Sequence, residues 1–479
     1  MQYMNKLKLI AAFLAIPMLT FAQQKDTWDL QRCVTYALDN NISVKQSDVQ
    51  ARLDALNLKQ AKSTQIPTLN FNTQGGYNFG RSVDPTTNQF TTNRVLFQSY
   101  SLQTGVTLFN FFRLKNDIKS KKIQSESAEA DVNRAKSDVT LNVAAAYLQF
   151  LLAKEQVNIA EGQIKLTTNQ LDLTRKQVAA GALPELNAAQ LASQLATDSS
   201  TYITNLTTME QNKLQLMALL NLSADMPFEV SLPDVDKIPL EPISELQPGL
   251  LYQHALTTQY QQKVDSLRIL SAKYAAKSAK ASMYPTLSAF GSVGSNYASS
   301  YMTQTGSFPY TDTLGSVNIN GQNYYTTAQG QFPVYSKAGY GKQIFDINLS
   351  QAIGVSLNIP IFNNRQSRTA WEQAKLNVQN LELQSDLNKQ TLQQDIYTAY
   401  NNAKSGIEKY NADSKGASYA AYAYHLAELR YENGMLSASD YLTAQNNLYT
   451  AKINQSAARF EYIFRLKVLE FYKYNHINL

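Results

Sequence analysis

The stretch QIFDINLSQAIGVSLNIPIF, residues 343–362, alternates between apolar and polar or small side chains over almost its whole length. The odd positions from Phe345 to Ile361 are apolar except Gln351, and the even positions are mostly Asp, Asn, Ser, Ala or Gly. A period of two residues predicts a β-strand with one apolar face. A strand over about residues 345–361 would be roughly three times as long as the usual strand of a soluble domain.

Three other segments share this alternation, at about residues 68–80, 99–109 and 286–297. Each has one apolar face and one face of Asn, Ser, Gln, Gly and Thr, without the Lys or Glu that soluble edge strands use against unwanted pairing. Tilted strands of about 9 to 11 residues cross a bilayer. The four segments therefore favour a membrane wall with one wet side over a soluble β-sandwich, whose strands also alternate.

A set of strands in lipid must close on itself, because every backbone polar group there has to be paired. Four strands are too few, since the smallest barrels have about eight. The sequence therefore predicts an oligomer. Long polar loops belong on the extracellular rim of such barrels, which fits residues 81–98 and 298–344. Pro67, Pro285 and Pro360 mark the opposite strand ends, where the strands meet helices.

The composition and the N-terminus fit an exported protein. The 479 residues are 44% hydrophobic and 17% charged, against about 25% charged in ordinary soluble proteins. Basic residues, an apolar run from Leu9 to Phe21 and the small Ala22 predict a secretory signal peptide, residues 1–22. No run of about 18 apolar residues is present, so no transmembrane helix is expected.

Two offsets relate distant parts of the chain and indicate an internal repeat. Ala37-Leu38 and Pro67-Thr68-Leu69 recur 218 residues later, whereas Phe109-Asn110, Ala146-Tyr147 and Gly181 recur 253 residues later. The second copy therefore contains a longer insertion between its Pro-Thr-Leu and Phe-Asn motifs. We divide the mature chain into repeat 1 (23–225), a Pro-rich linker (226–248) and repeat 2 (249–479).

Each repeat is expected to run helix, strand, loop, strand, long helix, turn and helix, which makes the fold mostly α with membrane β. In repeat 1, residues 110–180 carry an apolar seam with spacings of three and four residues, which predicts a long helix packed as a coiled coil. Its members are Val132, Ala135, Val139, Val143, Ala146, Phe150, Ala153, Val157, Ala160 and Ile164. In repeat 2, residues 376–433 repeat the seam with Leu392, Ile396, Ala399, Ala403, Ile407 and Tyr410.

Other functional classes find little support. His254, His425 and His476 are scattered without partners at metal-ligand spacing, and no nucleophile, nucleotide or zinc-protease motif occurs, so neither an enzyme nor a cofactor is expected. No basic cluster suggests a nucleic-acid partner. The lone Cys33 is interpreted as core packing.

The chain resembles the TolC family of outer-membrane efflux channels. The resemblance rests on the duplicated unit, WDLQRCVTYALDNN (28–41), the PTL entries to strands, TLFN and IPIFN at strand exits, and RYENGMLSASDYLTAQNNLYTAK (430–452). It implies a homotrimer whose chains share one twelve-stranded barrel in outer-membrane lipid, continued by a helical tube in the periplasm. It also implies a passive conduit in a tripartite efflux or type I secretion system, with a periplasmic adaptor (membrane fusion) protein and an inner-membrane transporter.

The turns after Gly181 and Gly434 resemble the family's periplasmic tips, where helix pairs close the tube. By position, Asn187 and Asp440 correspond to acidic residues that can face the pore in relatives, and Tyr431 corresponds to an aromatic residue of the gate. Two alternatives remain: Asp440 as a solvated residue of a first helical turn, favoured by the helix dipole, and Tyr431 as packing alone.

Two positions depart from the family pattern, because Leu436 and Thr443 stand where relatives can carry an arginine and a second acid. The family's gate salt bridges are therefore not carried over to this chain. A structural or adhesive coiled-coil surface protein without a pore is the remaining alternative function. Within the channel interpretation, the sequence does not separate export of small molecules from secretion of proteins.

Overall fold

The computed structural model describes residues 27–83, 88–231 and 238–475. The expected signal peptide, residues 1–22, lies outside these ranges, as do residues 232–237 of the linker. Within the described ranges the chain divides into two compact units. We call residues 54–125 and 268–381 the sheet unit, and residues 27–53, 126–267 and 382–475 the helical unit.

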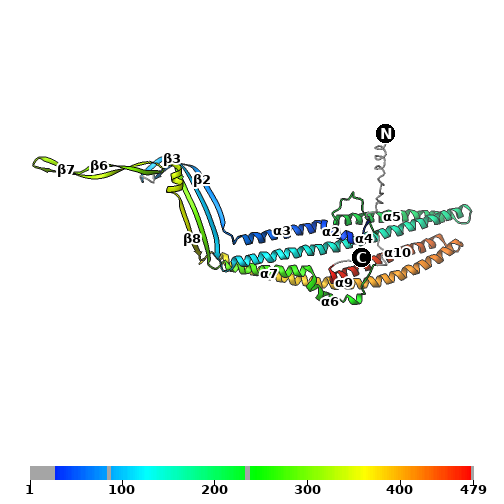
Figure 1. The fold of residues 1–479 in the computed structure, drawn as a ribbon. Helices are drawn as coiled ribbons and strands as arrows, with labels where there is room; N and C mark the ends of the chain where they lie inside the picture. Colours follow the sequence, from blue (N-terminus) through cyan, green and yellow to red (C-terminus); the bar gives the residue numbers. More distant parts are fainter. Residues whose placement is uncertain (1–26, 84–87, 232–237, 476–479) are drawn as a thin grey trace, which may run out of the picture. The chain divides into compact units, whose positions relative to one another are not determined.

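The sheet unit is built around one four-stranded antiparallel sheet (Figure 1). Its strands, in spatial order, are β2 (Thr68–Val83), β3 (Phe90–Phe109), β5 (Thr286–Ala298) and β8 (Ser350–Asn358). Strands β2 and β8 form the two edges and pair on one side only, among the described residues. Neither face is covered: on one face Leu69, Phe79 and Ile353 are 69%, 74% and 94% exposed, and on the other Asn70 and Gln103 are exposed as well.

The last strand is shorter than the expected 345–361. Residues Gln343–Ile347 form a π-helical turn, η3, and pairing with β5 begins only at Ser350, opposite Gly294. The buried side chain of Gln343 explains the change. Its Oε1 accepts from the backbone N–H of Ala298 at 3.0 Å and its Nε2 donates to the carbonyl of the same residue at 3.2 Å, which replaces a ladder partner.

The expected loop 298–344 is mostly strand. It forms a separate antiparallel hairpin of β6 (Met302–Ile319) and β7 (Gln322–Lys337), which extends from the sheet in Figure 1 and corresponds to the extra insertion of repeat 2. Within this hairpin Phe308 pairs with Phe332 and Val317 with Tyr324, and the register shifts twice along β6. Residues 81–83 and 90–98, also expected in a loop, extend β2 and β3.

The helices repeat with the offsets found in the sequence, which confirms the internal duplication. An offset of 218 residues relates α2 (Leu30–Asn40) to α6 (Pro248–Thr258) and α3 (Ile42–Ser63) to α7 (Tyr260–Ala281). An offset of 253 relates α4 (Arg113–Ala179) to α9 (Gln366–Glu432) and the start of α5 (Glu185–Leu219) to that of α10 (Ala438–Tyr474). No helix among the described residues is long and apolar enough to span a membrane.

The apolar seam of α4 forms the core of the helical unit together with α2 and α5. Its residues from Val139 to Ala160 are buried, whereas Val132 and Ile164 at the ends of the expected seam are only half-buried. In repeat 2, Ile396 and Ala403 are fully buried in a second cluster and Leu392 and Ala399 pack against it. The expected seam therefore lies in the core in both repeats.

Short segments also tie the linker to the helices. Strand β1 (Thr27–Trp28) pairs in parallel with β4 (Glu229–Val230), and a 3-10 turn, η2, covers Ile243–Glu245. The buried Nζ of Lys467 donates to the carbonyl of Pro239 at 2.7 Å and to Glu470 at 2.8 Å. The buried charge is thus fully paired, and it fixes the linker on α10.

Cys33 lies in the core with no exposed surface. Burial, reinforced by the charge of Asp29, raises the pKa of its thiol to about 12. The ordinary pKa of a cysteine thiol is 9.0. At the same mildly alkaline pH, the reactive thiolate of Cys33 should therefore be about a thousandfold rarer in the folded than in the unfolded chain. We expect no maleimide labelling of the folded protein and one label per chain after denaturation. Full labelling of the folded protein would contradict this placement.

Candidate gate at the helix turns

The two long helices end in the same kind of turn. At the end of α4 the N–H groups of Gly181 and Ala182 bond back to the carbonyls of Val178 and Gln177, both at 2.9 Å. At the end of α9 the N–H groups of Gly434 and Met435 do the same, at 2.9 and 2.8 Å. The two glycines have φ of +75° and +70°, a left-handed conformation that glycine adopts without a steric penalty.

The first turns of the following helices hold Asp440 and Asn187, which are 253 residues apart. Asp440 is exposed, its N–H donates to Ser437 Oγ at 3.1 Å, and its Oδ2 accepts from the same hydroxyl at 2.7 Å. Asn187 is half-buried, and its N–H donates to the carbonyl of Pro184. A carboxylate is favoured at a helix N-terminus by the helix dipole, so the capping geometry is compatible with either interpretation of Asp440.

Tyr431 belongs to a buried cluster of three tyrosines. Its ring stacks on Tyr441 at 4.7 Å between centroids, and its hydroxyl lies 3.2 Å from Thr174 Oγ1 of α4. The Tyr424 hydroxyl donates its only proton to Glu428, at 2.9 Å. Tyr441 is therefore the donor in the hydrogen bond of 2.9 Å between the Tyr441 and Tyr424 hydroxyls. The cluster joins both ends of the α9–α10 turn to α4.

Burial is the main reason why the phenols of Tyr424 and Tyr441 resist ionisation. It raises the pKa of Tyr441 to about 12. It also raises the pKa of Tyr424 well above the usual 10, and the hydrogen bond that Tyr424 donates to Glu428 and the charge of Glu428 add to the shift. Well below pH 10 both phenols are neutral in the folded and in the unfolded chain, so the stabilisation that they give is complete there. It is lost as the pH rises through the raised values.

The seam of α4 continues toward the turn with polar residues. The buried positions after Ala160 include the polar Gln163, Thr167, Gln170 and Thr174, still three and four residues apart, besides the apolar Leu171. Thr167 Oγ1 donates to the buried Asp198 at 2.6 Å and accepts from Gln445 Nε2 at 3.1 Å. The Nε2 atoms of Gln163 and Gln170 and the Oε1 of Gln445 are buried without a hydrogen-bond partner among the described residues.

These contacts show which expected residues come together. Tyr431 lies in the cluster, whereas Asp440, Asn187 and the two glycines lie at the turns that the cluster holds. Leu436 is half-buried against the tyrosines, so an apolar contact stands at its position. Sequence reasoning missed Tyr424, Tyr441 and the four polar seam residues. The sequence could have indicated the four polar seam residues, because they continue the three-and-four spacing of the apolar seam of α4.

The strand–helix junctions carry the three expected prolines. Pro67 and Pro285 directly precede β2 and β5, and Pro360 lies just beyond β8. After β3 the chain turns with Phe111 and Phe112 at positive φ, and 253 residues later Asn364 and Arg365 repeat this. The aromatic ring of Phe111 stacks on Tyr284 at 5.0 Å. The junctions are thus compact turns with the same backbone course in both repeats.

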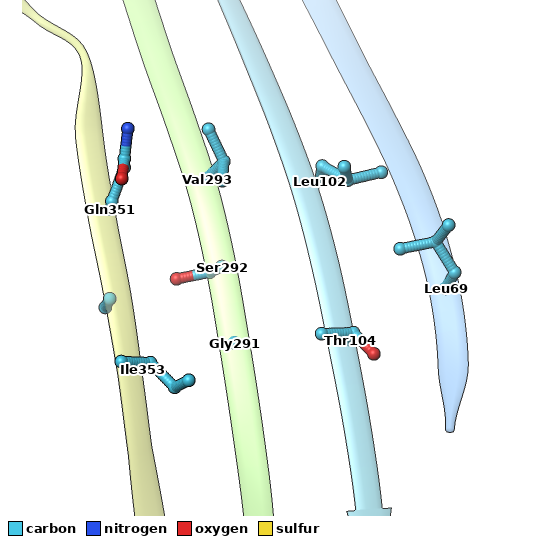
Figure 2. A pocket seen from close by; sticks show the side chains of 9 residues that line it. Leu69, Leu102, Thr104, Gly291, Ser292, Val293, Gln351 and Ile353 are labelled. Carbon is cyan, nitrogen blue, oxygen red and sulfur yellow. The ribbon is translucent and has the colours of Figure 1, made fainter. Parts of the chain in front are cut away.

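The apolar face of the sheet contains a shallow hollow of about 540 Å³ (Figure 2). The figure shows Leu69, Leu102, Val293 and Ile353, one from each of the four strands, around Gly291 and Thr104. Gly291 provides the gap, since an added Cβ would lie 3.1 Å from the Thr104 side chain. Among the described residues no group of three or more His, Cys, Asp or Glu could hold a metal ion.

Comparison with known proteins gives consistent matches. A model of the outer membrane efflux protein family matches residues 34–222 and 251–467, one segment in each repeat. Outer membrane protein TolC of Escherichia coli (strain K12) is 26% identical over 129 residues, which is 27% of this chain and only about a quarter (26%) of that protein.

Two solved structures share the fold. A membrane protein from Pseudomonas aeruginosa has a TM-score of 0.74 at 19% identity, with 93% of this chain and 91% of that chain covered. The Campylobacter jejuni CmeC outer membrane channel has a TM-score of 0.70 at 17% identity, with 92% of this chain and 84% of that chain covered.

The turn geometry gives a test with a matched control. Gly434→Ala should cost about 1 kcal/mol, because a Cβ is disfavoured at positive φ, and should raise local opening about fivefold. Gly416→Ala, in the interior of α9 with open space around the added Cβ, should instead stabilise by about 0.5–1 kcal/mol. Hydrogen–deuterium exchange over residues 412–445 measures both, and only Gly434→Ala should lower the protection of residues 428–445. Equal protection in the two variants would contradict the turn assignment.

Proposed function

The chain belongs to the outer membrane efflux protein family, and from this premise we propose that it is the outer-membrane channel of a tripartite efflux or type I secretion system. It would serve as a passive conduit for small molecules or proteins from the periplasmic side to the exterior. Family membership places the protein in the outer membrane, and the family is one of efflux channels rather than enzymes. The substrates and the transporter class belong to the proposal.

The open four-stranded sheet carries the proposal. Its apolar face is exposed along all four strands, and the opposite face presents Asn70, Asn72, Gln103 and Ser292. An apolar outer face and a polar inner face are what a lipid-embedded wall around a water-filled channel requires. The β2 and β8 edges run in opposite directions, so one chain's β8 can pair antiparallel with the next chain's β2.

A homotrimer is the closure that we propose, since three chains with four strands each supply twelve strands. An exposed stripe on α9 supports an interface in the helical unit as well. Tyr419, Tyr422, Leu426 and Leu429 are spaced by three and four residues and are 75%, 65%, 44% and 44% exposed. Such spacing is that of a coiled-coil seam, and a second copy of the chain is the proposed occupant.

The turns after α4 and α9 are the proposed periplasmic gate. Polar contacts hold them, and buried amide groups of the neighbouring seam lack hydrogen-bond partners among the described residues, which lowers the stability of this end of the helical unit. In a trimer Asp440 would form a ring of three carboxylates and Asn187 a neutral ring beside it. The turns are also the proposed contact for a periplasmic adaptor protein and, through it, an inner-membrane transporter.

Ion selectivity tests this assignment with two opposite variants. Asp440→Asn keeps a capping acceptor but removes the ring charge, and should lower the cation-to-anion permeability ratio at least about twofold. Asn187→Asp adds a ring of charge at the equivalent position and should raise the ratio. Reversal potentials in planar bilayers under a salt gradient measure both.

An exposed carboxylate distant from the turns is the control. Asp386 of α9 pairs with Lys389 at 2.9 Å, and Asp386→Asn should leave the selectivity unchanged. If neither Asp440→Asn nor Asn187→Asp changes the ion selectivity, Asp440 and Asn187 do not line the pore. A wild-type protein that inserts without conducting would contradict the channel itself and favour the structural or adhesive alternative.

A further inference from the structure

One row of the polar sheet face contains an aromatic side chain between two glycines. Thr68, Gly105, Phe290 and Gly354 pair in register across β2, β3, β5 and β8. Neighbouring rows on the same face carry Asn, Gln, Ser and Thr, so Phe290 is an apolar group in a polar surface. Its side chain is 44% exposed.

The ring of Phe290 leans toward Gly354 and away from Gly105. A Cβ added to Gly354 would lie 2.9 Å from the ring, so glycine is needed there to admit the ring. A Cβ added to Gly105 would meet only a backbone oxygen of Ala289, at 3.8 Å. The space above Gly105 is therefore open, with Phe290 as its wall.

This space is part of a hollow of about 560 Å³ on the polar face. It lies between the sheet and the end of α3, from which Gln60, Ser63 and Thr64 contribute. The sheet contributes Thr68, Gly105, Thr107, Ser288, Phe290 and Ser356. Its volume falls in the range of about 300–1,000 Å³ that is typical of small-molecule sites.

The chemistry of the lining is neutral and rich in hydroxyl groups. No lining residue is charged. The hydroxyls of Ser63 and Thr64 donate to backbone carbonyls of α3, at 2.9 and 2.6 Å, which leaves their oxygens as acceptors. Ser288 and Ser356 make no side-chain hydrogen bond within the described residues, so both can donate and accept. An aromatic ring next to such groups suits a ring that carries hydroxyl or amide substituents.

We propose that this hollow binds neutral aromatic molecules with hydrogen-bonding substituents, with Phe290 stacking on the ring and the hydroxyls of β5 and β8 meeting the substituents. The inference rests on the proposed channel, in which the polar face lines the water-filled interior. It names a class of exported molecules that pauses inside the barrel, beyond any selection by a transporter.

The test measures binding directly and does not require a conducting pore. Saturation-transfer NMR with chloramphenicol, a neutral aromatic with hydroxyl and amide groups, is recorded on the full protein in lipid nanodiscs. Sorbitol, which has hydroxyls but no ring, and empty nanodiscs serve as references. Wild type should saturate chloramphenicol and not sorbitol. Phe290→Ala should weaken binding by about two- to tenfold, the usual worth of one ring contact.

Gly105→Val fills the floor of the hollow, where an added Cβ would meet only a backbone oxygen at 3.8 Å, and should abolish binding. Gln103→Val, one row away on the same strand and face, should bind as wild type. If Phe290→Ala and Gly105→Val both bind like wild type, the site is wrong, and the same holds if sorbitol binds as well as chloramphenicol. Conductance without any added molecule is recorded separately. Its absence would count against the channel, whereas loss of binding in a conducting protein counts against this site alone.

Discussion

Backbone pairing in lipid is the constraint on which the structure depends. A chain that crosses a bilayer as strands must pair every N–H and C=O group, because no water is available to replace a missing partner. This chain supplies four strands in one sheet, with β2 and β8 as unpaired edges and both faces exposed. Such a sheet is incomplete alone, and in the proposed channel identical copies joined edge to edge give it closed walls. Oligomerisation, a shared barrel and a polar interior all follow from that requirement.

Duplication explains how one chain provides both the four strands of the sheet and the two glycine turns of the proposed gate. Helix bounds and backbone turns recur with offsets of 218 and 253 residues, and the β6–β7 hairpin accounts for the difference between the offsets. Each repeat therefore contributes two strands of the sheet and one glycine turn. The copies have diverged at the turns of the proposed gate, since Asp440 stands 253 residues after Asn187 and the tyrosine cluster belongs to the second turn. The two repeats thus have similar backbones but different side chains at their glycine turns.

Periodicity in the sequence was sufficient to predict a strand or a helix wherever one spacing rule determined it. Alternation located all four strands of the sheet, and the three-and-four spacing located the seams of α4 and α9. It failed at residues 345–349, which alternate but do not pair, because the Gln343 side chain satisfies the backbone of Ala298 in place of a strand. The polar continuation from Gln163 to Thr174 was missed because an apolar criterion ends a seam where polar residues begin. The Tyr424–Tyr441 contact depends on three-dimensional packing that no spacing rule contains.

The most direct test of the account is the number of chains in the folded complex. Light scattering of the purified protein, corrected for bound detergent, gives that number without assuming a function. The account predicts three copies, with twelve strands closing one barrel and the edges of β2 and β8 paired between neighbours. A folded monomer would mean that the four strands close no barrel, and the membrane channel would be contradicted with it.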